Sequence, residues 1–467
     1  MNNRSGQLLI DRNYEFFTPL DILSTLLGLF IIWIIIYLRT RRNAHLDYYK
    51  YYPRAFAFKM LFVLANCLFY IISYGAGGDS IGFWDGAVKL NNLFWKDPTL
   101  YFVELFSDPV DGGHMRNFDM TTGYPDSHIY GEIPSFFVCK VVSIFSFFTF
   151  KGYILLSFIF AFIATNASWK LFELVRSYNL HSDRILAIAI FFIPSLSFWC
   201  GGVSKDTFMW ISVCYFLVNL YQILSPEKRS TVWNWLMMLV FLYVMYRVRS
   251  FMILAVLAPL LFAYSARLGR KFGKRSVRRF LMRFAIIGIT VAGIMFFFQT
   301  TIADEYIKEA AVINEDMTNN KTYGTNRYDL GITDYSPVGM ALAFPNSVIA
   351  GFYRPFIWES LSVSLLLNGI ESIVLFYFTF RFLISKNIFK RIKRIRNQEF
   401  LVFAFFFALI LGYFAGFTSI LFGVLVRFKA PLLPFLVITL TSYLMEERTD
   451  ETENLITESV ESSDDQT

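Results

Sequence analysis

The stretch LDILSTLLGLFIIWIIIYL at residues 20–38 decides the fold, because it is mostly apolar and Asp21 is its only charged residue. A transmembrane helix needs about 20 such residues to cross the hydrocarbon core of a bilayer. Over all 467 residues, 55% are hydrophobic, 19% are aromatic and 17% are charged. A soluble chain of this size needs a polar surface that this composition cannot supply. The sequence predicts an all-α, polytopic helical membrane protein and excludes a cytosolic enzyme, a DNA-binding protein and a disordered scaffold.

Segments of the same kind recur along the chain and predict about eleven transmembrane helices. They lie at residues 20–38, 55–76, 152–174, 185–199, 205–223, 232–246, 249–266, 284–302, 360–384, 400–424 and 428–445. A further apolar stretch at 134–149 is short and contains Lys140. Residues 1–19 are polar and no cleavage site follows the first apolar run, so we expect that run to stay as a signal anchor.

Basic residues orient the chain, because loops rich in Lys and Arg stay on the cytoplasmic side of a membrane. Three loops have this composition, at residues 39–54, 267–283 and 386–396. These three loops lie on the same side of the membrane only if residues 134–149 do not cross it. This topology places the N-terminus outside, the C-terminus in the cytoplasm and the multi-pass domain at 20–445.

Two long loops, at 77–133 and 303–359, then face outward and contain nine and eight carboxylates. Residues 446–467 contain nine carboxylates and one arginine, which predicts an acidic, disordered cytoplasmic tail. The rest of the chain therefore holds 42 basic and 27 acidic residues, most of the excess in the cytoplasmic loops, where it contacts anionic membrane lipids. The net charge of +7 needs no nucleic acid to explain it.

The first outer loop opens with YGAGGDSIGFWD at residues 74–85. Its glycines let the chain turn sharply, and Asp79 is expected at the N-cap of the next helix. The pattern at residues 81–95 predicts an amphipathic helix on the membrane surface. Asp79, and after it Asp85, is a candidate general base. The competing interpretation is a capping Asp79 with a solvated neighbour.

The second motif is FIPSLSFWCGGVSKD at residues 192–206. Pro194 should end or kink a helix, the two glycines should form a turn, and Ser204 should cap the next helix. Lys205 opposes the dipole of that helix, so we interpret it as a phosphate ligand, with Asp206 in support. A Lys205–Asp206 pair at the interface is the alternative.

Further cations occupy the same outer face, where they could bind phosphate. They are Arg247 and Arg249 in a short turn, Arg354, and Arg427 and Lys429 at the start of the last helix. For Arg247 and Arg249, ordinary contact with lipid headgroups is an equally good explanation. Trp84 and Trp199 read as aromatic-belt residues, with sugar stacking as an alternative.

The sequence gives little indication of a metal site or of a functional cysteine motif. The four cysteines match no zinc or redox spacing. His114 and His128 share a polar loop with several carboxylates, which leaves a metal site open there, although solvated histidines explain them as well.

These motifs resemble the GT-C superfamily of membrane glycosyltransferases, mainly over residues 55–224. Asp79, or else Asp85, matches the essential acidic residue near the start of that superfamily's first outer loop. Residues 192–206 are similar to a Pro-Ser-x-x-Phe-Trp…Lys-Asp/Glu pattern of bacterial membrane proteins. The resemblance implies the cytoplasmic (inner) membrane of a bacterium and transfer of a sugar from a polyprenyl phosphate.

The implied acceptor is a lipid, a glycan or a protein, with no nucleic acid involved. The aspartate would deprotonate the acceptor hydroxyl, and Lys205, Arg247, Arg249 or Arg354 would hold the phosphate of the leaving group. No cofactor is required, and a divalent ion such as Mg²⁺ or Mn²⁺ stays open.

Two other functions fit the sequence. An O-antigen or capsule repeat-unit polymerase would use undecaprenyl-diphosphate-linked substrates on the same face. A secondary transporter or lipid flippase would place charges near the midplane, whereas the conspicuous charges here lie towards one interface.

Overall fold

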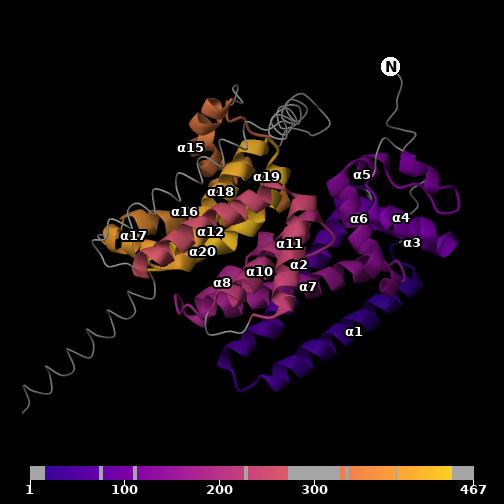
Figure 1. The fold of residues 1–467 in the computed structure, drawn as a ribbon, viewed down its shortest axis with the longest axis horizontal. Coiled ribbons are helices and arrows are strands. Elements are labelled where there is room, and N and C mark those ends of the chain that lie inside the picture. Colours follow the sequence, from indigo (N-terminus) through magenta and orange to yellow (C-terminus); the bar gives the residue numbers. More distant parts are fainter. Residues whose placement is uncertain are drawn as a thin grey trace, which may run out of the picture. The chain divides into compact units, whose positions relative to one another are not determined.

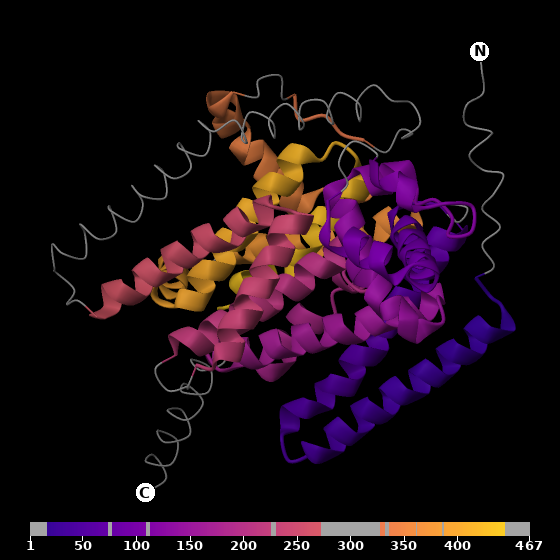
Figure 2. The same ribbon diagram turned by 45° about the vertical axis from the view of Figure 1, so that its right-hand side comes forward.

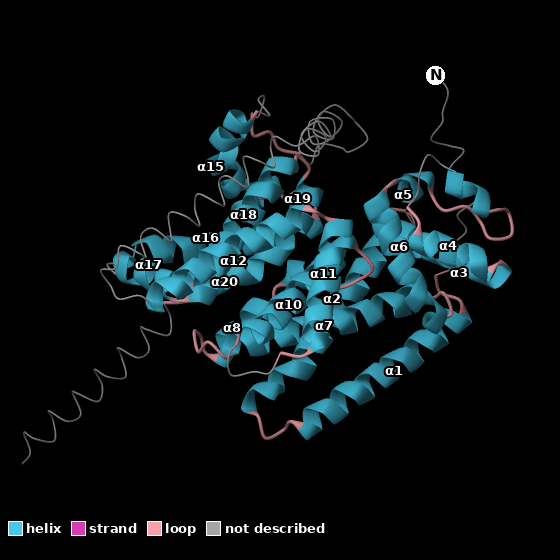
Figure 3. Cartoon of the chain, in the orientation of Figure 1, coloured by secondary structure: helices cyan, strands magenta, loops and turns pink. Residues whose placement is uncertain are grey.

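The computed structural model describes residues 16–72, 77–108, 113–225, 230–271, 327–331, 336–360, 362–384 and 387–443. Every regular element within these ranges is a helix, and no β-strand occurs there (Figure 3). The all-α prediction is therefore confirmed for the described part of the chain. The expected acidic tail at 446–467, the apolar segment at 284–302 and most of the basic loop at 267–283 lie outside it.

The chain divides into two compact units. The first comprises Met1–Leu171 and Leu196–Phe251, and the second comprises Phe172–Ser195 and Met252–Thr467. We describe each unit by itself, as labelled along the chain in Figure 1.

The first unit contains the predicted amphipathic helix and two predicted turns. Its elements are α1 (Pro19–Arg42), η1 (Asp47–Lys50), α2 (Tyr51–Ile72), α3 (Asp79–Lys96), α4 (Pro98–Phe106), η2 (Gly113–Asn117), α5 (Ser127–Gly131), α6 (Ile133–Ser146), η3 (Phe147–Thr149), most of α7 (Tyr153–Arg176) and α9 (Pro194–Trp199), α10 (Lys205–Leu224) and α11 (Val232–Val248). Figures 1 and 2 show α1 and α2 as a helical hairpin at one side of this unit.

The helix α1 displays the surface expected of a membrane span. A capping box between Thr18 and Asp21 fixes its start. Along its length Leu26 and Phe30 are among many large apolar side chains that are more than half exposed. Apolar exposure on this scale is stable in lipid and not in water. Near its far end, Arg39 Nη1 donates to Asn166 Oδ1 of α7 at 2.6 Å, which ties the hairpin to the unit.

The packing of α3 on α6 and of α10 on α11 builds the part of the first unit that carries the candidate site. The helix α3 buries Ile81, Phe83 and Leu90, as the amphipathic pattern predicts. At Gly86 an added Cβ would lie 2.8 Å from Cys139 Sγ of α6. The small residue therefore allows these two helices to approach closely.

The second unit is a set of apolar helices interrupted by breaks. Its elements are α8 (Asp183–Phe191), most of α12 (Phe251–Lys271), α15 (Pro337–Tyr353), η5 (Ile357–Glu359), α16 (Val363–Ile384), α17 (Ile388–Asn397), α18 (Glu399–Thr418), α19 (Phe422–Lys429), η6 (Ala430–Leu432) and α20 (Leu433–Leu440).

Two small-residue patterns bring α15 and α18 into direct backbone contact. A Cβ at Gly351 would lie 2.0 Å from the carbonyl oxygen of Gly412, and one at Gly416 would lie 1.9 Å from that of Ser347. Ser347 and Gly351, like Gly412 and Gly416, are four residues apart, which is the small-xxx-small spacing of closely packed membrane helices. Larger side chains at these glycines would force the helices apart.

Seven helices in the described ranges are long and apolar enough to cross a membrane. They are Pro19–Arg42, Asp47–Ile72, Tyr153–Arg176, Lys205–Leu224, Leu365–Ile384, Glu399–Thr418 and Phe422–Leu440. Shorter apolar helices cover Ile133–Thr149, Val232–Val248, Phe251–Tyr264 and Val338–Tyr353. A multi-pass membrane protein is thus indicated, while the number of about eleven crossings stays a prediction.

Two segments differ from the expected spans. The run at 185–199 is broken into α8 and α9 at Pro194. Proline lacks an N–H group and disfavours helical geometry at the residue before it. The outer loop expected at 303–359 contains the apolar helix α15, whose 17 residues include Pro345 and fall short of an ordinary span.

Candidate functional site

In the first outer segment, α3 starts one residue earlier than expected. Gly78 is the N-cap residue, with φ of 83°, a backbone conformation that glycine adopts without strain. Asp79, predicted as the N-cap, is instead the first residue of the helix and is half-buried. Its carboxylate lies in the first turn, where the helix dipole stabilises negative charge.

Asp85 occupies a different environment, one turn and a half further along α3. Its side chain is buried, and Lys89 Nζ lies 2.5 Å from its Oδ2. The two residues form an i,i+4 ion pair on the same helix. Burial and the pairing with Lys89 disfavour a general-base role for Asp85.

The turn before α10 has the predicted form. Gly201 and Gly202 lie in it, and Ser204 caps α10 by accepting a hydrogen bond from the N–H of Thr207 at 3.2 Å. At Gly201 an added Cβ would lie 2.3 Å from a methyl group of Val63. The turn is therefore packed tightly against α2.

Lys59, on α2, holds this turn in a way that the sequence interpretation missed. Its ammonium group is buried and donates to the carbonyl oxygens of Leu196 and Cys200, at 3.4 and 3.2 Å. These carbonyls belong to α9 and the residue that follows it. A lysine inside an apolar segment was the available signal, since charged residues within membrane spans usually have a specific partner.

The alternative interpretation supposed that Lys205 and Asp206 pair with each other. In the structure each of them forms an ion pair with another residue. Lys205 Nζ lies 3.2 Å from Glu132 Oε2, just before α6, and Asp206 Oδ1 lies 2.5 Å from Arg249 Nη1, the C-cap residue of α11. Burial disfavours the charged form of Glu132, but Lys205 and the hydroxyl of Ser135 outweigh it and hold its pKa below the usual value.

Arg247, in the last turn of α11, forms a two-pronged ion pair with Asp108. Its Nη1 donates to Asp108 Oδ2 at 2.9 Å and its Nη2 donates to Oδ1. This hydrogen bonding lowers the pKa of Asp108, and the charge of Lys140 on α6 adds to the effect. Lys140 Nζ donates to the carbonyl oxygen of Ser107, so two cations converge on this segment.

Three ion pairs therefore converge around α6 and the facing ends of α10 and α11. In two of them the carboxylate is accessible, since the side chains of Asp108 and Glu132 are 39% and 44% exposed. An anion that approached from solvent could replace either carboxylate on Arg247 or Lys205. The third pair, Asp206–Arg249, is buried and supports the other two.

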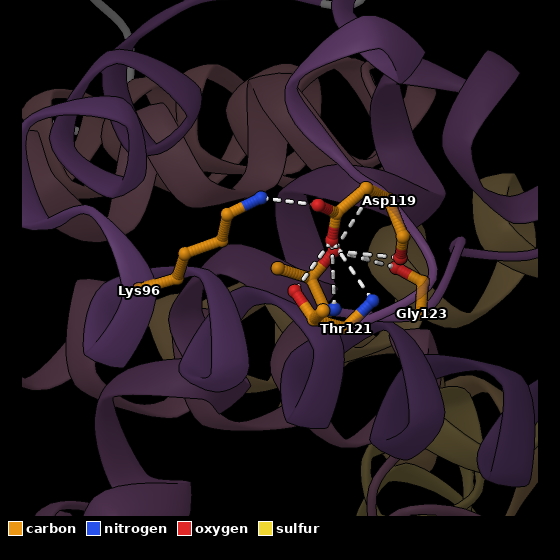
Figure 4. A network of polar contacts seen from close by, with 5 residues as sticks. Lys96, Asp119, Thr121 and Gly123 are labelled. Atoms are coloured by element: carbon orange, nitrogen blue, oxygen red, sulfur yellow. Dashed lines mark hydrogen bonds and ion pairs between the residues drawn. The ribbon is translucent and has the colours of Figure 1, made fainter.

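The segment between α4 and α5 is organised by Asp119 (Figure 4). Its Oδ1 accepts hydrogen bonds from the N–H and hydroxyl groups of Thr121, at 3.0 and 2.7 Å, and its Oδ2 pairs with Lys96 at the end of α3. Lys96 and Thr121 hold the pKa of Asp119 below its ordinary value. The network fixes this segment against the helix that begins with Asp79.

The other predicted cations belong to the second unit. Lys429 is completely buried and donates to the carbonyl oxygen of Arg354 at 2.7 Å and to Ser372 Oγ at 3.2 Å. It ends α19 and lies inside the apolar segment Phe422–Leu440, not at the start of the last helix as expected. Arg354 lies over the ring of Tyr328 and 3.5 Å from Glu359, and Arg427 is half-buried. The surroundings of Lys429 thus favour an internal structural role.

Glu371 on α16 is a further buried carboxylate of the second unit that the sequence interpretation missed. Its Oε1 accepts a hydrogen bond from the backbone N–H of Ser195 at 2.8 Å, directly after the break between α8 and α9. Glu371 is the single acidic residue in the apolar segment Leu365–Ile384, which was its signal in the sequence.

The two predicted tryptophans lie in packed surroundings in the first unit. Trp84 Nε1 donates to the carbonyl oxygen of Lys151 at 2.7 Å, and its ring packs against Tyr153. Trp199 is buried against Phe69 and Phe198. These contacts favour a packing role for both rings over sugar stacking.

The described part of the chain contains no group of three His, Cys, Asp or Glu side chains placed to hold a metal ion. His128 lies 3.5 Å from Glu132, and the side chain of His114 is outside the described residues. The described residues therefore offer no set of ligands that would support binding of Mg²⁺ or Mn²⁺.

Comparison with known proteins finds no match to any family model, curated protein or solved structure.

Proposed function

We propose that this protein is a membrane glycosyltransferase that moves a sugar from a polyprenyl phosphate to a lipid, glycan or protein acceptor. The observation that supports it is the grouping in the first unit of Lys205 and Arg247, each paired with an accessible carboxylate. Asp79 begins the helix α3 that packs along α6 in the same unit. We place the reaction on the outer face of the cytoplasmic membrane of a bacterium.

The proposed reaction is a direct displacement at the anomeric carbon. Asp79 accepts the proton of the acceptor hydroxyl as its oxygen attacks the sugar. The bond from the anomeric carbon to the phosphate oxygen breaks, and the polyprenyl phosphate leaves with the electron pair. Lys205 and Arg247 stabilise the charge that develops on the leaving phosphate.

The buried pair Asp206–Arg249 has a positioning role in this proposal. It fixes the first turn of α10 to the residue that caps α11. Lys205 is adjacent to Asp206, and Arg247 is two residues from Arg249. The pair therefore holds the charged groups of Lys205 and Arg247 in place before substrate binds. Preorganised cations of this kind stabilise charge without rearranging during the reaction.

The experiment is a profile of lipid-linked sugars in cells that lack the protein. Accumulation of a polyprenyl-monophosphate sugar supports transfer. Accumulation of a diphosphate-linked oligosaccharide would instead favour a repeat-unit polymerase, and no change in either lipid would exclude both enzymes. Restoration of the normal profile by the native gene is the reference.

The variant Asp79→Asn should fail to restore the profile while it accumulates in the membrane normally. The matched control is Asp126→Asn, in the same outer segment, because Asp126 caps α5 and asparagine caps a helix equally well. Full restoration by Asp79→Asn would remove Asp79 as the base.

A further inference from the structure

The helix α17 (Ile388–Asn397) joins two apolar segments that are long enough to cross a membrane, Leu365–Ile384 and Glu399–Thr418. Its sequence, IFKRIKRIRN, contains five basic residues. Ten residues rise about 15 Å, half of the hydrocarbon thickness, and so many charges would oppose insertion. This helix therefore has to lie at the membrane surface, beside the ends of its neighbours.

One face of α17 is attached to the second unit by Arg391. The guanidinium group is buried and donates to the carbonyl oxygens of Arg381 and Phe382 in the last turn of α16, at 2.9 and 3.3 Å. It also lies 3.7 Å from the centre of the Tyr443 ring. A cation at these carbonyls is favourable, and the attachment fixes which face of α17 turns outward.

The outward face combines apolar and basic side chains. Phe389 and Ile392 are 84% and 48% exposed, and Lys393 and Arg396 are exposed beside them. At 100° per residue these four side chains fall within an arc of about 100°. Apolar and cationic residues on one exposed face are typical of helices that lie in the headgroup region of a membrane.

The end of α16 that precedes α17 exposes apolar side chains. Phe380, Leu383 and Ile384, in its last turns, are 55%, 56% and 63% exposed. Apolar surface of this kind needs acyl chains around it, and α17 begins four residues after Ile384. The exposed face of α17 therefore adjoins the surface that acyl chains cover.

We infer that α17 is a binding site for the headgroups of anionic phospholipids. Phe389 and Ile392 enter the boundary between headgroups and acyl chains, and Lys393 and Arg396 bind the lipid phosphates. Arg391 is a positioning residue that holds the helix in this orientation. The inference is independent of the proposed glycosyltransferase activity, because it concerns the second unit alone.

The test is thermal unfolding of the full chain in a neutral detergent, titrated with phosphatidylglycerol or with phosphatidylcholine. Phosphatidylglycerol should raise the Tm, and phosphatidylcholine should not. The double variant Lys393→Gln/Arg396→Gln should weaken the apparent affinity for phosphatidylglycerol about 30-fold. The matched control, Lys393→Arg/Arg396→Lys, keeps both charges and should bind as the native chain does.

Arg391→Gln separates positioning from binding. It should lower the Tm in detergent without lipid, whereas the double variant at exposed positions should leave that Tm unchanged. Binding should weaken with added salt, because the attraction is screened.

Several outcomes would overturn the inference. They are equal effects of the two lipids, native-like affinity of the double variant, and equal stabilisation by inorganic phosphate, which would indicate a simple anion site. Discrimination between the lipids that appears only after removal of residues 446–467 would show that the acidic segment, and not lipid, covers this face.

Discussion

Arg249 Nη1 lies 2.5 Å from Asp206 Oδ1, and the side chain of Asp206 has no exposed surface. The pair joins the first turn of α10 to the C-cap residue of α11. Arg249 therefore differs from Arg247, its neighbour two residues back, whose carboxylate partner is accessible. A phosphate ligand at Arg249 would have to displace a buried carboxylate, which makes this arginine a support for the site.

The variant Asp206→Ala should destabilise the protein by about 3–5 kcal/mol, because it removes the buried carboxylate that pairs with the guanidinium of Arg249. The double variant Asp206→Ala/Arg249→Ala should recover part of this loss. Thermal unfolding in detergent across the native, single and double variants measures the coupling between the two side chains. Additive losses would show that the two residues do not depend on each other.

The contact between α15 and α18 gives a second prediction. Gly416→Ala should lower the free energy of unfolding by about 1–3 kcal/mol, since its methyl group would overlap the carbonyl oxygen of Ser347 and push the helices apart. Gly423→Ala is the matched control, because an added Cβ there meets no atom within 4 Å. If both variants unfold at the same temperature, the close approach of the two helices is wrong.

Local features of the candidate site could be predicted from the sequence. Pro194, the glycine turn and the Ser204 cap act through neighbouring backbone groups, so their effects can be read within a few residues. The predicted N-cap of α3, Asp79, was wrong by one residue. Gly78 and Asp79 both suit the start of a helix, and only the backbone geometry selects between them.

Partners across long sequence distances could not be predicted in the same way. Arg247 and Asp108 are 139 residues apart, and Lys205 and Glu132 are 73 apart. Nothing in a local pattern distinguishes these carboxylates from the other acidic residues of the outer segment. Helix α15 was missed because its 17 residues include a proline, although the spacing of Ser347 and Gly351 was a visible packing signal.

Acid should destabilise the second unit through His181. Burial, with the nearby charge of Arg394, lowers the pKa of His181 to about 4. A histidine with a depressed folded-state pKa binds protons more readily when unfolded. Its contribution is fully present above about pH 6.5 and is lost as the pH falls towards 4, by about 3 kcal/mol in total.

The free energy of unfolding, measured between pH 8 and pH 4, should therefore fall less steeply in His181→Gln than in the native chain. Glutamine keeps a polar group near Thr441, whose hydroxyl lies 3.2 Å from His181 Nε2. An unchanged profile in His181→Gln would mean that other groups cause the acid loss.

The last prediction concerns competition between carboxylate and phosphate at Arg247, and it depends on the proposed activity. If the phosphate of the lipid-linked sugar binds this arginine, it must take the place of Asp108. Asp108→Asn removes the competing charge and should lower the KM for the donor, whereas Arg247→Gln should raise it about tenfold or more. Asp108→Glu keeps the charge and should leave the KM near its native value. A raised KM in Asp108→Asn, equal to that of Arg247→Gln, would show instead that Asp108 orients the arginine and that the phosphate binds elsewhere.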